Sequence, residues 1–263
     1  MSTTIKVETM ADYMARGESP EILFWVGCAG SFDERAKKIT KAIVRILDHA
    51  GIKFAVLGTE ESCTGDPAKR AGNEFLFQMQ AMNNISVLNG YNVKKIVTAC
   101  PHCFNTLKNE YPSLGGSYEV IHHTQLVQQL INEGKLKVQG GVFKGKKITF
   151  HDPCYLGRGN GVYEAPREVI EKLDVELAEM KRSRAKGFCC GAGGAQMFKE
   201  AEKGNNEVNI DRTEEALALT PDVIATGCPF CMTMMTDGVK HFNKEASTKV
   251  LDVAELIAQA NDL

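Results

Sequence analysis

The chain has 263 residues, enough for one large domain or two of modest size, each able to bury a core. Its 31 Lys and Arg against 33 Asp and Glu leave a net charge of −2, which argues against a nucleic acid as partner. It has no run of about 18 apolar residues and no basic, apolar leader, so a cytoplasmic protein is expected. Nine cysteines are many for a compartment that keeps thiols reduced, and they indicate metal or redox chemistry.

Short apolar runs alternate with longer amphipathic stretches in the first half of the chain. The runs predict strands at residues 22–26, 53–57, 95–98 and 118–121. The longer stretches predict helices at 34–50, 68–88 and 123–131. The first helix is expected to end at Gly51. This alternation of strands and helices is typical of α/β layers with a largely parallel sheet.

The second half of the chain repeats the first. At an offset of 126 residues, 22–28 aligns with 148–154 and Cys63 with Cys189. At offsets of 128 and then 130, residues 96–103 match 224–231 and 120–127 match 250–257. The repeat predicts strands at 147–151 and 222–226 and helices at 166–173 and 205–219.

We therefore expect two tandem homologous modules related by pseudo-twofold symmetry, each a small, largely parallel sheet with flanking helices. The Gly- and Lys-rich stretch 133–147 indicates a linker or exposed turn, which gives module one as residues 1–139 and module two as 140–263. Cysteines that follow the strands should lie in loops beyond the carboxyl edge of each sheet, where open α/β sheets place their sites.

Eight of the cysteines form two matching quartets, and the ninth, Cys190, has no counterpart in module one. The quartets are Cys28, Cys63, Cys100 and Cys103, then Cys154, Cys189, Cys228 and Cys231. Soft thiolates suit iron-sulfur clusters or zinc, and each CxxC places two sulfurs on one centre. The alternatives are zinc, metal-free thioredoxin-like dithiols, structural disulfides and free buried cysteines. One CxxC with two distant cysteines in each module favours iron-sulfur over these.

The run from Cys154 through Cys189-Cys190-Gly191 to Cys228-x-x-Cys231 resembles the cysteine-rich CCG domain. That domain occurs in tandem in the B-type and D-type subunits of heterodisulfide reductase and in the iron-sulfur subunits of glycolate oxidase and lactate-utilisation systems. The resemblance covers residues 20–260 and implies an iron-sulfur redox subunit. It implies a noncubane [4Fe-4S] cluster in module two. The implied ligands are Cys154, Cys189, Cys190, Cys228 and Cys231.

Module one departs from the family pattern because Thr64 replaces the second cysteine of the pair. Its four cysteines are sufficient for a cubane or modified [4Fe-4S] cluster. Many relatives also carry a ferredoxin domain, which residues 1–20 are too few to form. Electrons that enter through such a domain are expected to come from another subunit.

Other residues near the cysteines are candidates for chemistry. His151 stands close to Cys154, and we expect it to deliver protons, with Asp152 orienting its ring. The open side of the site is predicted near Cys190, Gly191 and His151, so that Cys190, His151 and Asp152 are the predicted catalytic residues. Gly191 allows tight turning around a cluster. His102, inside the first CxxC, is expected to donate a hydrogen bond rather than bind metal, and His122 and His123 are expected to begin a helix.

The leading hypothesis is an oxidoreductase subunit that takes electrons from a ferredoxin-like or flavin-containing partner, which could be membrane-bound. It would reduce a quinone or a disulfide at the module-two cluster, and a quinone would be met at the inner membrane face through that partner. Two alternatives stay open at this stage. One is a non-catalytic electron relay or structural cluster protein, and the other is a metal-free thiol-disulfide oxidoreductase.

Overall fold

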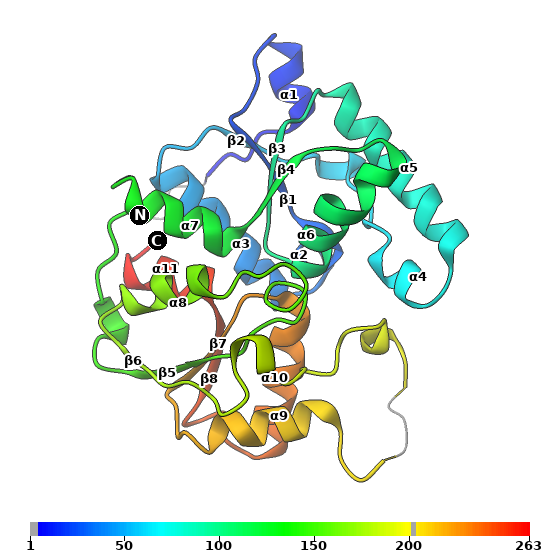
Figure 1. The fold of residues 1–263 in the computed structure, drawn as a ribbon. Helices are drawn as coiled ribbons and strands as arrows, with labels where there is room; N and C mark the ends of the chain where they lie inside the picture. Colours follow the sequence, from blue (N-terminus) through cyan, green and yellow to red (C-terminus); the bar gives the residue numbers. More distant parts are fainter. Residues whose placement is uncertain (1–4, 201–203) are drawn as a thin grey trace.

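The computed structural model describes residues 5–200 and 204–263, which form two four-stranded sheets, one in each half of the chain (Figure 1). Strand order in module one is β2-β1-β3-β4, in chain order Ile22–Trp25, Phe54–Ala55, Lys95–Thr98 and Glu119–His122 for β1 to β4. The order in module two is β6-β5-β7-β8, with Lys147–Phe150, Glu176–Leu177, Val223–Thr226 and Lys249–Asp252 as β5 to β8. All pairings within these sheets are parallel, which confirms the predicted fold class.

Both faces of each sheet are buried, because parallel sheets carry helices on both sides. Along β1, Ile22 and Phe24 belong to one hydrophobic core and Leu23 and Trp25 to another. This alternation follows from the period of two in a strand. It explains why the strands have continuous apolar sequences rather than alternating ones.

The inner faces of the two sheets share one core. Four helices lie between the sheets (Figure 1), where α3 packs on α11 and α7 on α8. These helices are α3 (Ala36–His49), α7 (His123–Asn132), α8 (Glu164–Glu171) and α11 (Val253–Ala260). Their apolar side chains form a single cluster with those of β1, β3, β5 and β7. The modules are therefore joined through a common hydrophobic interior.

The outer faces are covered by each module's own helices. The outer core of module one includes α5 (Glu74–Gly90) and α6 (Pro101–Asn105), and that of module two α9 (Val208–Leu217) and α10 (Pro229–His241). The remaining helices are short: α1 (Met10–Ala15), α2 (Gly27–Phe32) and α4 (Asp66–Arg70). Among the described residues, no helix has the length and apolar character needed to cross a bilayer.

Two expectations need correction. The single helix expected at 68–88 is divided into α4 and α5, because Gly72 adopts a φ of +87° and Asn73 caps the second helix through its side chain. The stretch 133–147 is not simply an exposed turn, since Leu136 and Phe143 are buried in the shared core. The chain between the modules is thus fixed by packing.

The strand order positions the cysteines. In module one, β2 lies on one side of β1, whereas β3 and then β4 lie on its other side. The direction in which strands are added to the sheet therefore reverses between β1 and β3. Such a reversal opens a crevice at the carboxyl ends of the two strands. Cys28 follows β1 and Cys100 follows β3; in module two, Cys154 and Cys228 follow β5 and β7 in the same way.

The ion pair between Arg35 and Glu255 connects the two modules, and its loss should destabilise the fold. The Arg35 guanidinium binds both Glu255 carboxylate oxygens at 2.8 Å and the Val250 carbonyl oxygen at 3.0 Å. Arg35→Ala leaves the buried Glu255 carboxylate without its cation, so the free energy of unfolding should fall by about 2 kcal/mol. This loss is smaller than for a fully buried pair, because solvent screens the partly exposed Arg35.

Chemical denaturation of cluster-loaded protein measures this loss. Lys37→Ala, in the first turn of the helix that Arg35 precedes, removes an exposed pair with Glu34 and should change the free energy of unfolding by less than about 0.5 kcal/mol. Equal effects of the two substitutions would contradict a role for Arg35 in joining the modules.

Candidate metal centres

The four cysteines of module one meet at the carboxyl edge of its sheet. Cys28 lies in the first turn of α2, and Cys100 and Cys103 lie at the start of α6. Cys63 reaches them from the loop before α4. All four line one cavity, in which Cys28 lies close to Cys63 and Cys100 lies close to Cys103. The four cysteines that the sequence groups together therefore also lie together in space.

The five cysteines of module two form an equivalent group. The thiols of Cys154 and Cys189 lie close together, and Cys190 lies next to Cys189 in sequence and in space. The sulfur of Cys190 is 3.3 Å from that of Cys231, which is also in contact with Cys228. All five sulfurs thus belong to one chain of contacts.

Thr64 occupies the position in module one that Cys190 has in module two. Its buried hydroxyl donates to the sulfur of Cys103 at 3.9 Å, just as the Cys190 thiol contacts Cys231. Threonine in place of cysteine therefore changes the donor from a thiol to a hydroxyl, but the side chain still points to the equivalent sulfur. Module one presents four thiols and a hydroxyl where module two presents five thiols.

Glycines shape the backbone beside the second cysteine of each module. Gly65 and Gly191, equivalent at the offset of 126, have φ angles of +88° and +91°. A Cβ at Gly65 would lie 2.8 Å from the Phe77 ring, and one at Gly191 would lie 3.2 Å from Val208. The Gly191 N–H donates to the sulfur of Cys189 at 3.3 Å. Glycine here permits both the left-handed turn and the close approach to sulfur.

The two cysteine groups touch at the boundary between the modules. The thiols of Cys100 and Cys228 lie close enough for each to shift the pKa of the other. Beside them, the buried His122 ring donates from Nε2 to the carbonyl oxygens of Ala99 at 3.2 Å and Gly227 at 3.0 Å, the residues immediately before these two cysteines. Burial lowers the pKa of His122 well below its usual range, so the ring is neutral. One histidine thus connects both CxxC turns.

His122 and His123 begin α7 as expected, but they also have partners in module two. Nδ1 of His122 accepts from the backbone of Thr124, which leaves its Nε2 as the donor described above. His123 Nε2 lies 2.9 Å from the Asp252 carboxylate at the start of α11. The two equivalent helix starts are therefore bound to each other across the boundary.

Contacts between thiols shift their pKa values, and in the pair Cys28 and Cys63 the two shifts have opposite directions. A hydrogen bond from Cys28 lowers the pKa of Cys63 to about 7, and the same contact raises that of Cys28. In module two, the contact with Cys189 raises the pKa of Cys190 to about 12. Thiols must lose their protons to bind a metal, so metal binding at these groups should release protons.

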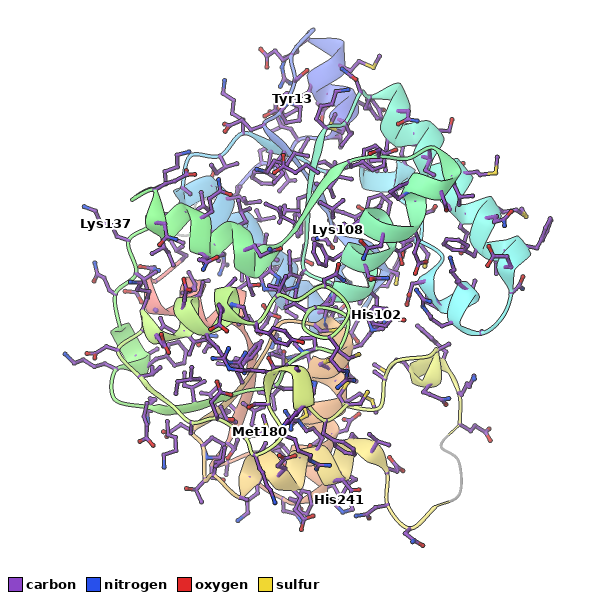
Figure 2. All side chains as sticks on the ribbon, in the orientation of Figure 1. Tyr13, His102, Lys108, Lys137, Met180 and His241 are labelled. Carbon is purple, nitrogen blue, oxygen red and sulfur yellow. The ribbon has the colours of Figure 1, made fainter. Side chains whose placement is uncertain are left out.

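His102 lies where the modules meet (Figure 2), where a carboxylate and two aromatic rings hold its side chain. Its Nδ1 is 2.8 Å from the Asp66 carboxylate, which also binds Arg70. Its ring packs against Tyr155 and Phe230 of module two, with centroids at 4.6 and 5.2 Å. A hydrogen bond with Asp66 and ring packing hold this side chain beside the cysteine cavity.

Asp152 does not orient His151 in the structure. Its carboxylate binds Arg167 through two hydrogen bonds of 2.7 and 2.9 Å and accepts the backbone N–H of Arg184 at 2.7 Å. His151 instead accepts at Nδ1 from Nε of Arg212 at 3.0 Å. Burial, with a smaller effect of Arg212, lowers the pKa of His151 to about 3. A histidine with that pKa is neutral at pH 7, and nothing in this geometry favours its expected role in proton delivery.

Comparison with known proteins identifies the family. The profile of the cysteine-rich domain (CCG) matches residues 22–108 and again 148–236. The chain belongs to the cysteine-rich domain family. It contains two copies of the domain, and each copy carries one of the cysteine groups described above.

Three relatives share these cysteine-rich domains. The chain is 48% identical over 256 residues to the "Probable iron-sulfur-binding oxidoreductase FadF" of Bacillus subtilis, covering 97% of this chain and 36% of that protein. It is 47% identical over 250 residues to the "EtfAB:quinone oxidoreductase" of Syntrophomonas wolfei, covering 93% and 35%. It is 34% identical over 267 residues to a heterodisulfide reductase subunit of Methanosarcina barkeri, covering 97% and 60%. The chain thus spans about a third of the first two relatives.

The donor sets of the two cysteine-rich domains fit iron-sulfur clusters. Each domain gathers thiols at the carboxyl edge of a parallel sheet, with backbone N–H groups and glycines beside them, as cluster sites require. Among the described residues all nine cysteines are free thiols. The sulfurs that would bind each cluster are therefore present and converge.

Sequence reasoning missed Arg212 and the bridging contacts of His122. Arg212 lies in α9, far along the chain from His151, and no local motif surrounds it. His122 could have been noticed, because at the offset of 130 it is equivalent to Asp252, another residue that begins a helix. That equivalence indicates a shared structural position but does not reveal the contact with the opposite module.

His122→Leu should destabilise the protein because it leaves the carbonyl oxygens of Ala99 and Gly227 without their donor. Unpaired buried acceptors cost about 1–3 kcal/mol, so the free energy of unfolding should fall by about 2 kcal/mol. His49→Leu on the exposed end of α3 is the matched control and should have an effect below about 0.5 kcal/mol. Denaturation curves for the two variants check this, and equal stability of the two would refute the bridging role.

Proposed function

We propose that this chain is the cluster-binding part of an iron-sulfur oxidoreductase, which receives electrons from a partner and transfers them to a quinone or a disulfide. The observation that carries the proposal is the convergence of nine cysteines in two groups, which lie next to each other at Cys100 and Cys228. The names of the relatives support the acceptor classes, since one is a quinone oxidoreductase and another belongs to a heterodisulfide reductase. Iron-sulfur clusters supply one-electron redox chemistry in such sites.

The two modules are proposed to hold different clusters. Module two, with five thiols, is suited to the noncubane [4Fe-4S] cluster. Module one, with Thr64 in the fifth position, is suited to a cubane or modified [4Fe-4S] cluster. Contact between Cys100 and Cys228 gives electrons a short path from one module to the other.

The names of the relatives support a proposal for the partner and the location of the chain. The name "EtfAB:quinone oxidoreductase" and a similar "Probable membrane-anchored ferredoxin" of Chromohalobacter salexigens, 41% identical over 254 residues, support a flavin-containing or ferredoxin-like electron donor. A ferredoxin-like donor anchored in a membrane would place the chain at the inner membrane face, where quinones are reached.

The acceptor is proposed to bind beside module one. Cys190 and His151, near which the open side was expected, are buried. Two grooves of about 320 and 330 Å³ instead open on the half-buried Cys28 and Cys63, on either side of Phe198. The first is apolar, with Phe32, Phe198 and Phe230 in its wall. An apolar groove of this size suits a planar, uncharged molecule such as a quinone head group.

Metal analysis of anaerobically purified protein tests the proposed function. We expect iron and acid-labile sulfide in equal amounts and an EPR signal on reduction. Zinc without sulfide would overturn the proposal in favour of a structural metal site, and a metal-free protein with redox-active dithiols would favour thiol-disulfide exchange.

Reciprocal substitutions test the assignment of the clusters. Cys190→Thr gives module two the motif of module one, and Thr64→Cys does the reverse. EPR spectra should show that Cys190→Thr removes the signal specific to the five-cysteine centre, while Thr64→Cys gives module one a signal of that kind. Unchanged spectra in both variants would contradict the proposed ligand roles.

Phe198→Asp tests the proposed acceptor groove. A charge in the apolar groove should raise KM for a water-soluble quinone and lower kcat/KM by about tenfold or more, because apolar pockets reject charge. Phe75→Asp, at an exposed residue of α5 outside both grooves, is the control. Steady-state reduction of the quinone, with cluster EPR as a check of integrity, measures both. Equal kinetics would favour an electron relay that never contacts the acceptor.

A further inference from the structure

His151 carries a buried ring nitrogen that has no partner. Its side chain is 1% exposed, and Nε2 makes no hydrogen bond with any described residue. Unpaired buried polar groups are costly and rare, so such groups in native proteins have an explanation, such as a bound ion or cofactor. Nε2 is therefore evidence of a ligand.

Arg212 determines which ring nitrogen carries the hydrogen. A guanidinium has only donors, so Nδ1 of His151, 3.0 Å from Nε of Arg212, must accept. Arg212 is itself fully buried and fixed by the Arg182 carbonyl oxygen at 2.9 Å and the Glu215 carboxylate at 3.1 Å. The hydrogen of the neutral ring must then lie on Nε2.

This arrangement makes His151 a hydrogen-bond donor toward the module-two centre. A ring nitrogen of His151 and the sulfurs of Cys190 and Cys231 lie within 4.8 Å of one another, a spacing that could also suggest a His-Cys-Cys metal site. Metal binding through Nε2 would require its lone pair and would move the hydrogen to Nδ1, facing the N–H of Arg212. The contact with Arg212 therefore disfavours His151 as a ligand.

Module one has a similar donor at the equivalent position. Trp25 aligns with His151 at the offset of 126, is fully buried, and its Nε1 also has no partner among the described residues. It belongs to the same buried cluster as Cys100 and Cys103. An indole nitrogen donates and never accepts or binds metal. The two modules thus share a buried, unpaired ring N–H and differ in the ring that supplies it.

We propose that Trp25 and His151 each donate a hydrogen bond from the ring N–H to anionic sulfur, thiolate or sulfide, of the cluster in their own module. Arg212 is the positioning residue that fixes the tautomer of His151. Hydrogen bonds to sulfur favour the more negative, reduced state, so these donors raise the reduction potential of each centre. The proposal rests on the cluster-binding function proposed above.

Redox titration followed by EPR tests this with reciprocal variants. His151→Phe should lower the reduction potential of the module-two centre and leave that of module one unchanged, and Trp25→Phe should do the opposite. His151→Gln keeps an N–H donor and should restore part of the lost potential. Iron and sulfide contents should match those of the wild type. Unchanged potentials in the two Phe variants, with iron retained, would overturn the proposal.

Pulsed EPR on protein labelled with ¹⁵N-histidine tests the hydrogen bond to the cluster directly. A hydrogen-bonding histidine gives a weak nitrogen coupling, and His151→Gln should remove it. A strong coupling of the directly bound kind, or loss of iron in His151→Phe, would show that His151 is a ligand and overturn the proposal. Absence of iron from the wild-type protein would instead refute the proposed function itself, so the two failures are distinguishable.

Discussion

The contact between the two CxxC turns is the constraint on which the site depends. Strand order sends β1, β3, β5 and β7 toward the boundary of the modules, and each of these strands is followed closely by a cysteine. His122 then joins the carbonyl groups that precede Cys100 and Cys228. Because this ring is neutral, buried and part of the start of α7, the distance between the two cysteine groups is set by the fold itself.

The two modules have the same fold but carry different chemical groups at equivalent positions. Thr64 and Cys190 point at equivalent sulfurs, and Trp25 and His151 stand at equivalent strand ends. Each exchange keeps the position in the module and changes the group that the side chain offers. A pair of modules that began alike can in this way present two centres with different ligands and different potentials, which suits electron transfer in one direction.

Much of the fold was predictable because the information is local or repeated. The strands, the cysteine groups and the modular repeat all follow from patterns within about 10 residues or from the offset between the halves. The break between α4 and α5 was also visible in principle at Gly72 and Asn73. The expected contact of Asp152 with His151 was wrong because neighbouring residues at a strand end point to opposite faces. Arg212, Phe198 and the bridge made by His122 depend on tertiary packing, for which a single sequence gives no local signal.

Magnetic coupling between the two centres tests the account most directly. With both clusters in paramagnetic states, the EPR spectrum should show splitting or broadening from spin–spin interaction, because the contact of Cys100 with Cys228 places the centres side by side. Selective loss of one cluster should leave the other with a simple, uncoupled spectrum. Two independent signals that add without interaction in the fully loaded protein would contradict the continuous site across the modules.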